Sequence, residues 1–269
     1  MKNKYFRVLT IAGSDSGGGA GIQADIKSIS ANGCYAMSVV TALTAQNTVG
    51  VSAIHPVPVD FVTAQIDAVL TDIGTDAVKI GMLFSPDLIR KVAASLQKFA
   101  ISNIVLDPVM VATSGDRLVE DDALEALKKN IVPMAEIITP NLPEAEVLSG
   151  REITEEEDME AAAEALCGLG CKNVLIKGGH FEGKYASDLL YLGEEKRTVA
   201  LPAERIDTNN THGTGCTLSS AIASGLAKGQ GMELAVQNAK EYITGSIAAG
   251  AGYVIGRGHG PVHHFFRNW

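Results

Sequence analysis

The chain has 269 residues, 46% of them hydrophobic and 20% charged, which is ordinary for a folded protein. Its formal net charge of −9, its aromatic content of 5% and its lack of a basic run argue against nucleic acid as a partner. No apolar stretch reaches the roughly 18 residues that span a bilayer. The polar first residues do not resemble a signal peptide, so we expect no membrane partner and a cytoplasmic location.

The first half of the chain alternates short apolar runs with amphipathic segments. Strands are predicted at 7–13, 37–43, 76–80 and 103–106, and helices at 20–32, 60–73, 86–99 and 121–130. In the first of these helices, Ile22, Ile26 and Ile29 share one face. A glycine-rich turn at 14–19 joins the first strand to this helix.

The second half continues the alternation. Short strands are predicted at 136–139 and 173–177, and helices at 154–169, 215–228 and 232–249. Thr154 and Glu157 form a capping-box pattern at the start of the first of these helices, and the segments 186–192 and 196–201 indicate a two-stranded excursion. Strands alternating with helices predict a mainly parallel sheet covered on both faces. We find no linker or repeat and expect one domain over 1–269.

Cysteine and histidine patterns give no metal or disulfide signature. Cys167 and Cys171 are expected to pack as small apolar residues, and the tail histidines stand near no acid or cysteine in the sequence, which favours a structural tail. A reducing cytosol fits this cysteine usage. The four cysteines are Cys34, Cys167, Cys171 and Cys216, and the tail histidines are His259, His263 and His264.

The first glycine turn is open to several interpretations. Residues 19–24 read GAGIQA, which fits a dinucleotide pattern, but a nicotinamide enzyme needs an acid about 20 residues further on, and 39–45 contain none. The alternatives are a turn against which a small ligand lies, with Asp15 or Asp25 as polar contacts, and a purely structural tight turn. The phosphate loop of P-loop ATPases is absent from the sequence.

A second glycine site, THGTGC at 211–216, opens a long predicted helix. Small residues allow backbone N–H groups to approach an anion, and the helix N-terminus adds positive potential, so this site suits a transferring phosphate. An ordinary helix cap is the alternative. Cys216 lies in the first turn, where the pKa of a thiol tends to fall, and it could accept a proton from a substrate hydroxyl. Simple packing is the alternative for Cys216.

Polar residues also follow three predicted strands. Asn141 and Glu144 are three apart and can point the same way from a first helical turn, as a hard-oxygen pair that positions hydrated Mg²⁺. Asp107, at a neighbouring strand end, could assist, and Lys177 could neutralise phosphate. Taken singly, each of these patterns is also compatible with ordinary surface residues.

Together these motifs resemble the hydroxymethylpyrimidine/phosphomethylpyrimidine kinases of thiamine biosynthesis, in the ribokinase-like superfamily. The segments that carry the resemblance cover nearly the whole chain in the expected order. They are TIAGSDSGGGAGIQAD (10–25), TAQNTVGV (44–51), KIGML (79–83), LDPVM (106–110), ITPNLPEA (138–145), IKGGH (176–180), NTHGTGCTLSSA (210–221) and GPVHHF (260–265).

The resemblance implies a three-layer α/β/α fold and a homodimer. It implies that ATP phosphorylates 4-amino-5-hydroxymethyl-2-methylpyrimidine, a small heteroaromatic alcohol, and then its monophosphate, in one pocket. Gln46 would hydrogen-bond the aminopyrimidine edge, and a flap at 111–118, with Thr113, Ser114 and Gly115, would cover the site. The pyrimidine pocket would be lined by Gly13, Asp25, Met82 and Val109.

The resemblance also implies roles at the phosphate end of that pocket. Asp107 and Glu144 would be the Mg²⁺ ligands, and Lys177 would contact the transferring phosphoryl group. The catalytic residues would be Cys216, Lys177, Gly213 and Gly215, with 213–216 as the anion hole. The nucleotide would be bound by Asn141, Glu144, Thr211, Gly213 and Thr214.

One departure from the wider superfamily concerns the proposed base. Many sugar kinases of the wider superfamily carry Asp where this chain has Cys216. A thiol at a helix N-terminus can take the place of that carboxylate as the base. We therefore expect Cys216→Ala to lose most of kcat while ATP binding is kept. The nearest alternative function is a pyridoxal kinase of the same fold. A non-catalytic nucleotide- or vitamin-binding regulator and a nicotinamide oxidoreductase are alternatives from other classes.

Overall fold

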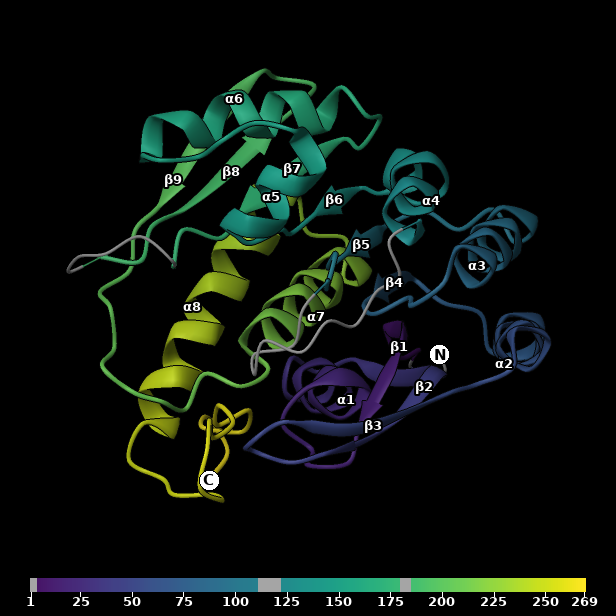
Figure 1. Cartoon of the computed structure of the whole chain (residues 1–269), viewed down its shortest axis with the longest axis horizontal. Coiled ribbons are helices and arrows are strands. Elements are labelled where there is room, and N and C mark those ends of the chain that lie inside the picture. Colours follow the sequence, from purple (N-terminus) through teal and green to yellow (C-terminus); the bar gives the residue numbers. More distant parts are fainter. Residues whose placement is uncertain (1–3, 111–121, 180–184) are drawn as a thin grey trace.

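The centre of the molecule is a sheet of parallel strands (Figure 1). The structure is a computed structural model that describes residues 4–110, 122–179 and 185–269. Within these residues, nine strands pair in the order β3-β2-β1-β4-β5-β6-β7-β8-β9. Strands β2, β1, β4, β5, β6 and β7 run parallel, and the antiparallel pairs β2–β3, β7–β8 and β8–β9 extend the sheet at its two edges. The strands span Arg7–Asp15 (β1), Tyr35–Gln46 (β2), Val51–Pro56 (β3), Ala77–Ile80 (β4), Ile104–Leu106 (β5), Ile137–Ile138 (β6), Asn173–Ile176 (β7), Asp188–Leu192 (β8) and Arg197–Leu201 (β9).

Helices cover both faces of the sheet, which confirms the predicted three-layer α/β/α architecture. One face packs against α1, α7 and α8 through a core that includes Ile29, Ile222 and Tyr242. The other packs against α2 to α6, of which α2, α3 and α4 follow one another along the right of Figure 1. The helices span Gly21–Ala31 (α1), Val59–Asp72 (α2), Pro86–Lys98 (α3), Ala123–Asn130 (α4), Leu142–Ser149 (α5), Glu156–Cys167 (α6), Thr214–Ala227 (α7) and Met232–Gly250 (α8), with a 3₁₀ turn at Val132–Met134.

The structure corrects three details of the sequence prediction. The segments expected to form a two-stranded excursion are β8 and β9, which continue the central sheet because β8 pairs with β7 along its whole length. Strand β3 was not predicted, since its residues are exposed and lack an apolar pattern. The capping box of α6 lies one residue later than expected, with Glu155 and Asp158 as its members, while Thr154 also donates to the Asp158 carboxylate.

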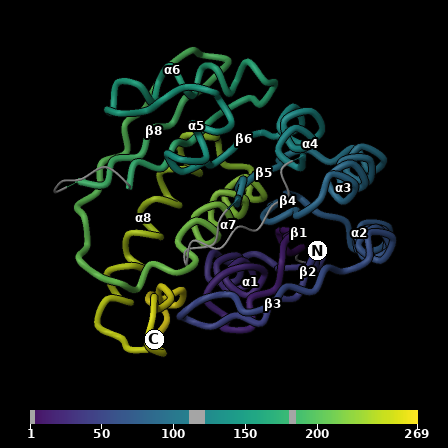
Figure 2. Tube along the Cα trace, viewed as in Figure 1, coloured from purple at the N-terminus to yellow at the C-terminus, as the bar shows by residue number. Residues whose placement is uncertain are grey.

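The C-terminal segment after α8 packs against the turn between β2 and β3. In Figure 2 this segment lies beside the tip of the β2–β3 ribbon. The contact is a set of bonds to Thr48: His259 N–H donates to the Thr48 carbonyl at 2.8 Å, and the N–H groups of Arg257 and Gly258 donate to the Thr48 hydroxyl at 3.2 and 3.3 Å.

No helix among the described residues is both long and apolar enough to cross a membrane.

Candidate active site

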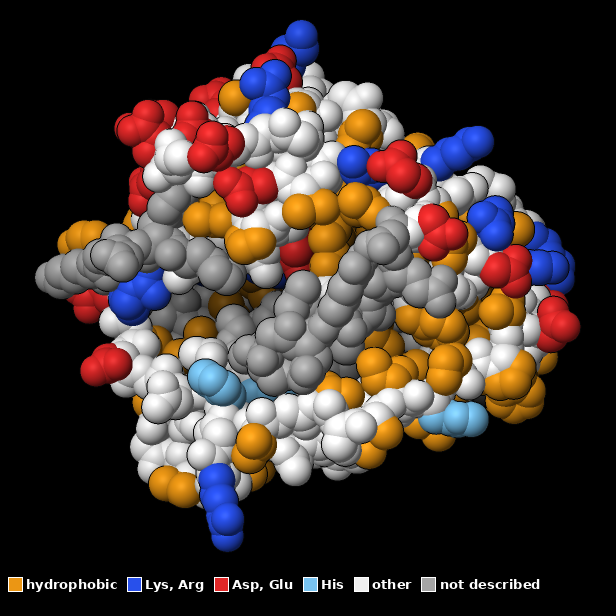
Figure 3. All heavy atoms as spheres, in the orientation of Figure 1, with side chains coloured by type: hydrophobic (Ala, Val, Ile, Leu, Met, Phe, Trp, Pro, Cys, Tyr) orange, Lys and Arg blue, Asp and Glu red, His pale blue; other side chains and the backbone are white. Residues whose placement is uncertain are grey.

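A cavity of about 780 Å³ opens where the parallel strands end. Figure 3 shows the hollow near the middle of this face. The end of β2 and the segments that follow β1, β4, β5, β6 and β7 contribute to its wall, together with the N-terminal end of α7. This is the place where ligands bind in sheets of this kind, because the loops that follow adjacent parallel strands converge there. The cavity contains every predicted site residue except Asp25.

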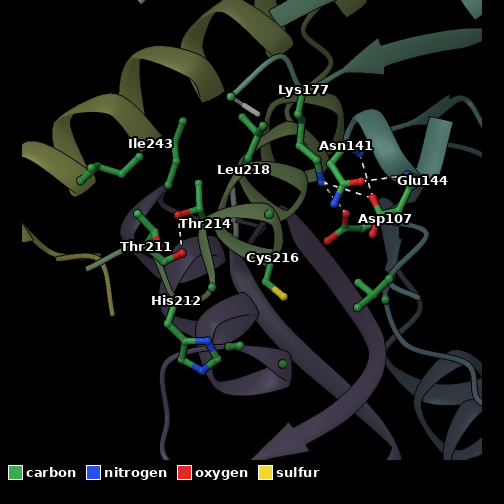
Figure 4. A pocket seen from close by; sticks show the side chains of 18 of the residues that line it. Asp107, Asn141, Glu144, Lys177, Thr211, His212, Thr214, Cys216, Leu218 and Ile243 are labelled. Atoms are coloured by element: carbon green, nitrogen blue, oxygen red, sulfur yellow. Dashed lines mark hydrogen bonds and ion pairs between the residues drawn. The ribbon is translucent and has the colours of Figure 1, made fainter. Parts of the chain in front are cut away.

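One side of the cavity is organised by the start of α5. Asn141 is the N-cap: its side-chain oxygen accepts the Glu144 N–H at 2.9 Å, and the Glu144 carboxylate accepts the Asn141 N–H at 2.8 Å. This reciprocal capping box satisfies two N–H groups that a helix start leaves unpaired. The sequence Asn-x-x-Glu therefore fixes both side chains at the cavity wall, as the dashed lines in Figure 4 show.

Lys177 lies between two carboxylates at this side. Its ammonium donates to Asp107 at 3.1 Å and lies 4.0 Å from the nearer oxygen of Glu144 (Figure 4). Burial of Asp107 disfavours its charge, but the ammonium groups of Lys177 and Lys79 outweigh burial and hold the pKa of Asp107 below its usual value. Burial, reinforced by the charge of Asp107, raises the pKa of Glu144. The cluster thus combines an anionic carboxylate, a second carboxylate that protonates more readily and a lysine shared by both.

The opposite side of the cluster is the N-terminus of α7. Gly213 is its N-cap, with φ of 79°, and a Cβ there would lie 1.9 Å from the Gly19 carbonyl oxygen, so only glycine fits. The Thr214 hydroxyl donates to the Thr211 carbonyl at 2.7 Å. Helix geometry leaves the N–H groups of Gly215 and Cys216 without a carbonyl partner four residues earlier. These two donors and the helix dipole face the cavity beside Lys177, which suits an anion.

The protonation of Cys216 differs from the sequence expectation. Its position in the first turn of α7 was expected to lower the pKa of the thiol. Burial instead raises the pKa of Cys216 to about 11, because desolvation of the thiolate outweighs the attraction of Lys79 and the N–H of Gly21. Cys216 is therefore a neutral thiol at pH 7 in this structure.

The other end of the cavity is lined mainly by uncharged residues. Gly13 lies against Met82, whose terminal carbon would be 2.7 Å from a Cβ at Gly13, so glycine leaves the space that Met82 fills. The Thr41 hydroxyl donates to the Met82 carbonyl at 3.0 Å and fixes this turn. Gln46, at the end of β2, accepts a bond from the Thr44 hydroxyl at 3.0 Å through its side-chain oxygen. With Val109, these residues line this end of the cavity as expected from the sequence.

Asp25 does not line the cavity, contrary to the sequence expectation. It is fully buried on α1, behind the cavity wall. Its carboxylate accepts bonds from the hydroxyls of Thr10 and Ser220 at 2.6 and 2.8 Å and from the ammonium of Lys79 at 2.9 and 3.0 Å. Lys79, rather than Asp25, reaches the wall. Sequence reasoning gave Lys79 no role, because a lysine in a short apolar run does not reveal a partner 54 residues away.

A second unforeseen pair joins the two glycine turns. His212 Nε2 lies 2.9 Å from the Asp15 carboxylate, and both side chains are nearly buried. Asp15 also accepts the N–H groups of Gly17, Gly19 and Ala20 at 2.7, 3.0 and 2.8 Å. The sequence pointed to Asp15 as a possible ligand contact, and Asp15 lines the cavity. Its oxygens also organise the first turn and connect it to the second.

The cavity continues past β7 into a more apolar region. Its wall there is formed by α7, α8 and the segment before α7, and Lys240 of α8 donates to Asp188 of β8 at 2.7 Å. Asp188 in turn accepts the Gly178 N–H at 3.0 Å, which holds the turn that follows Lys177. The apolar lining residues in this region are Val147, Leu218, Ile243 and Ile247. Sequence reasoning did not identify this region, since its apolar residues come from three separate helices, α5, α7 and α8.

Comparison with known proteins places these features in a family. A family model described as Phosphomethylpyrimidine kinase matches residues 15–263. The chain belongs to this family. A hydroxymethylpyrimidine/phosphomethylpyrimidine kinase of Rhizobium meliloti (strain 1021) is 52% identical to it, over 97% of each chain.

Two solved structures extend the comparison. The phosphomethylpyrimidine kinase of Clostridium difficile 630 shares 47% identity with a TM-score of 0.78, covering 88% of this chain and 97% of its own. A pyridoxal kinase of Bacillus subtilis, solved as an ADP complex, shares 38% identity with a TM-score of 0.90, covering 98% of this chain and 100% of its own. The ribokinase-like fold and a kinase activity of this family member are thereby established, and the nicotinamide oxidoreductase and the non-catalytic regulator are not supported.

Two remaining predictions concern other parts of the chain. The flap predicted at 111–118 lies outside the described residues. Among the described residues, no three His, Cys, Asp or Glu side chains gather as a metal site. His264 is instead buried, where its Nε2 lies 3.1 Å from the Thr217 hydroxyl and its carbonyl accepts the Tyr242 hydroxyl at 2.8 Å. It joins the tail to α7 and α8.

Proposed function

We propose that this protein transfers the γ-phosphoryl group of ATP to 4-amino-5-hydroxymethyl-2-methylpyrimidine and then phosphorylates the resulting monophosphate, in thiamine biosynthesis. The observation that carries this proposal is the division of one cavity into two ends. Lys177, two carboxylates and the N-terminal amides of α7 form an anion-binding end. Gly13, Met82 and Gln46 form an end that suits a flat ring with a polar edge. A family relative named for the same two activities is 52% identical over 97% of both chains.

The donor set at the anion-binding end fits magnesium. Asp107 and Glu144 present carboxylate oxygens to the cavity, and Asn141 lies beside them. Mg²⁺ prefers oxygen ligands, usually keeps several waters and is often held by one or two carboxylates together with substrate phosphates. When bound, the ion would neutralise charge on the phosphates. The low pKa of Asp107 keeps that ligand anionic at neutral pH.

In the first transfer, we assign binding of the leaving phosphates to the N–H groups of Gly215 and Cys216, with Lys177 neutralising the charge of the transferring group. Positioning and charge stabilisation dominate phosphoryl transfer, so this arrangement supplies most of what the reaction requires. The oxygen of the hydroxymethyl arm attacks phosphorus, a P–O bond to ADP breaks, and the alcohol proton passes to the Cys216 sulfur in the fraction of molecules that hold a thiolate. Gln46 orients the ring through the donor and acceptor of its amide.

The direct test follows both products by mass spectrometry. The protein is incubated with Mg-ATP and the hydroxymethylpyrimidine, and we expect the monophosphate first and the diphosphate later, each with one ADP. Gln46→Leu should lower kcat/KM for the alcohol by at least about tenfold, because the bound ring loses its polar partner. ADP formation without a phosphorylated pyrimidine, or a product that never passes the monophosphate, would contradict the proposal.

A second candidate function is pyridoxal phosphorylation. The observation that favours it is the close structural likeness to the Bacillus subtilis pyridoxal kinase, at a TM-score of 0.90. Both substrates are flat heteroaromatic rings with a hydroxymethyl arm. Measuring kcat/KM for each substrate under the same conditions decides between them, and we expect the pyrimidine to be favoured. A clear preference for pyridoxal would reverse the assignment.

We further propose that the protein is a cytoplasmic homodimer. Large apolar side chains are exposed on both faces of the β2–β3 ribbon and on the nearby C-terminal segment, and exposed apolar surface of this kind is typical of an interaction surface. The exposed residues are Leu43, Val49, Ile54, Val254 and Ile255. All four cysteines are free, which fits a reducing compartment.

A further inference from the structure

Lys79 is a fully buried lysine whose ammonium reaches the cavity wall. It lies on β4, beside Thr10 of β1 and Val105 of β5, in the middle of the parallel sheet. Burying an ion pair carries a desolvation cost that an apolar pair of similar volume avoids, so a buried pair is weak evidence of stabilisation alone. A strongly perturbed ion pair that lines a cleft is instead a candidate for function.

The pair is oriented toward the cavity. Lys79 lines the wall, whereas Asp25 lies behind it and also binds the hydroxyls of Thr10 and Ser220. The positive end of the pair therefore faces the ligand space. A lysine ammonium has three N–H donors, and the only acceptors assigned to Lys79 among the described residues are the two oxygens of Asp25.

The surroundings of Lys79 place it at the acceptor end. A Cβ at Gly81 would lie 2.9 Å from Lys79 Nζ and 3.0 Å from the Ala12 side chain, so glycine at 81 leaves the room that the ammonium occupies at the wall. Gly81 precedes Met82, which lines the proposed pyrimidine pocket. Although burial alone would lower it, the charge of Asp25 holds the pKa of Lys79 above its usual value, with smaller contributions from Cys216 and Asp107.

The other cations of the described wall are engaged elsewhere. Lys177 is shared by Asp107 and Glu144 at the anion-binding end. Lys240 is paired with Asp188 past β7, and the guanidinium of Arg205 donates to the Gly179 carbonyl in the same region. Lys79 is thus the lysine of the described wall whose partner carboxylate does not itself line the cavity.

The two proposed acceptors differ most in charge. The alcohol is neutral, whereas a phosphate monoester carries nearly two negative charges above pH 7, since its second pKa is about 6. Bringing that anion up to the γ-phosphoryl group is opposed by repulsion, which a nearby fixed cation offsets. The first transfer has no such requirement.

Resting on the proposed function, we propose that Lys79 determines specificity for the second transfer: its ammonium, held at the wall by Asp25, binds the phosphate of the monophosphate acceptor. Asp25 is then a positioning residue that aims the ammonium and keeps it charged. The same cavity accommodates both acceptors because the neutral alcohol has no charge for Lys79 to bind, while the anionic monophosphate does.

The test measures each transfer separately, with the alcohol and the monophosphate supplied as separate substrates. The variant is Lys79→Met combined with Asp25→Asn, since Lys79→Met alone would leave a buried carboxylate unpaired. We expect kcat/KM for the monophosphate to fall by at least about 100-fold, as for loss of a charge-assisted contact. We expect kcat/KM for the alcohol to change by less than about fivefold, because the double substitution removes both the attraction of Lys79 and the repulsion of Asp25 that act on the Cys216 thiolate. Equal losses in both transfers, or no loss in either, would overturn the role of Lys79.

The matched control is Arg7→Met. Arg7 and Asp76 form an ion pair at 2.7 Å at the opposite ends of β1 and β4 from the cavity, so this variant loses an ion pair without touching the site. Its two kcat/KM values should keep the wild-type ratio. The two transfers are first measured with the wild-type protein. If it phosphorylates neither pyrimidine, this result contradicts the proposed function itself rather than the role of Lys79.

Two further measurements do not depend on that double variant folding. Lys79→Gln with Asp25→Asn keeps polar groups in the buried positions and should show the same selective loss. A crystal structure of the wild-type protein with the monophosphate needs no substitution at all. We expect a phosphate oxygen about 3 Å from Lys79 Nζ, and a phosphate held only by Lys177 and the α7 amides would refute the inference.

Discussion

Cys216 illustrates how burial and charge compete at a single side chain. Desolvation dominates and raises its pKa to about 11, although Lys79 and the N–H of Gly21 favour the thiolate. A thiolate is then a minor species at pH 7, and below the pKa its population grows about tenfold for each unit by which the pH rises. The two transfers should respond differently, because only the alcohol has a proton to lose.

Cys216→Ala is therefore expected to separate the two reactions. It should lower kcat of the first transfer by at least about 100-fold, in the range of a lost general base, and kcat of the second by less than about fivefold. ATP affinity, measured by calorimetry, should stay within about threefold. The loss is the mirror image of that expected for Lys79, so the two variants control for each other. An unchanged first transfer would end the assignment of Cys216 as the base.

The pH dependence gives an independent measure of the same residue. In the wild-type protein, kcat of the first transfer should rise between pH 7 and 9, as the thiolate fraction grows toward a pKa of about 11. The second transfer should be nearly flat over this range, because the monophosphate is already ionised above pH 7. Rates are measured in initial-velocity assays at saturating Mg-ATP. A flat profile for the first transfer would show that Cys216 does not act through its thiolate.

At the level of the elements, His264 links the tail to α7 and α8. Burial lowers the pKa of His264 to about 4, and in the unfolded chain histidine has a pKa of about 6.5. Between pH 6.5 and 4, the unfolded state therefore binds a proton that the folded state does not bind. The contribution of His264 to the free energy of unfolding is full above pH 6.5 and is lost as the pH falls toward 4. At pH 4.5 the expected loss from this group is about 2.5 kcal/mol.

Urea unfolding at pH 7.5 and 4.5 tests this linkage. His264→Gln should cost about 1 kcal/mol at pH 7.5, from the weakened bond to Thr217, but should lose about 2 kcal/mol less than the wild type between the two pH values. The control is His55→Gln, at an exposed position on β3, which should follow the wild-type curve. Parallel curves for all three proteins would mean that His264 does not remain neutral when folded.

Some of these elements and sites could be predicted from the sequence and others could not. Local signals placed most helices and strands within a few residues, and glycine next to a strand or helix end marked both turns of the cavity. The capping pair Asn141 and Glu144 could be predicted because its two members are only three residues apart in the sequence. The pairs Lys79–Asp25 and Lys240–Asp188 join residues 54 and 52 apart, and only the packing of separate elements brings them together. The pKa of Cys216 also depends on burial, which a local motif does not report.

For the whole molecule, the exposed β2–β3 ribbon has a consequence for assembly. We expect the 28.2 kDa chain to run as a dimer in light scattering coupled to size exclusion. Leu43→Glu combined with Ile54→Glu should shift it to a monomer, because charges placed on a buried apolar interface are costly. Phe61→Glu, at an exposed position on α2, is the control and should remain dimeric. A monomeric wild type, or a dimer unaffected by the ribbon substitutions, would refute this interface. That the chain is one domain over 1–269 stays a prediction.

The contact between Gly19 and Gly213 ties the two halves of the reaction together. Neither backbone can shift toward the other, and the Asp15–His212 pair resists their separation. The segment that borders the acceptor and the segment that receives the phosphates are therefore held in one fixed arrangement between donor and acceptor. A ligand that orders one segment also orders the other. If the acceptor raises the affinity for the nucleotide in this way, the nucleotide must raise the affinity for the acceptor by the same factor.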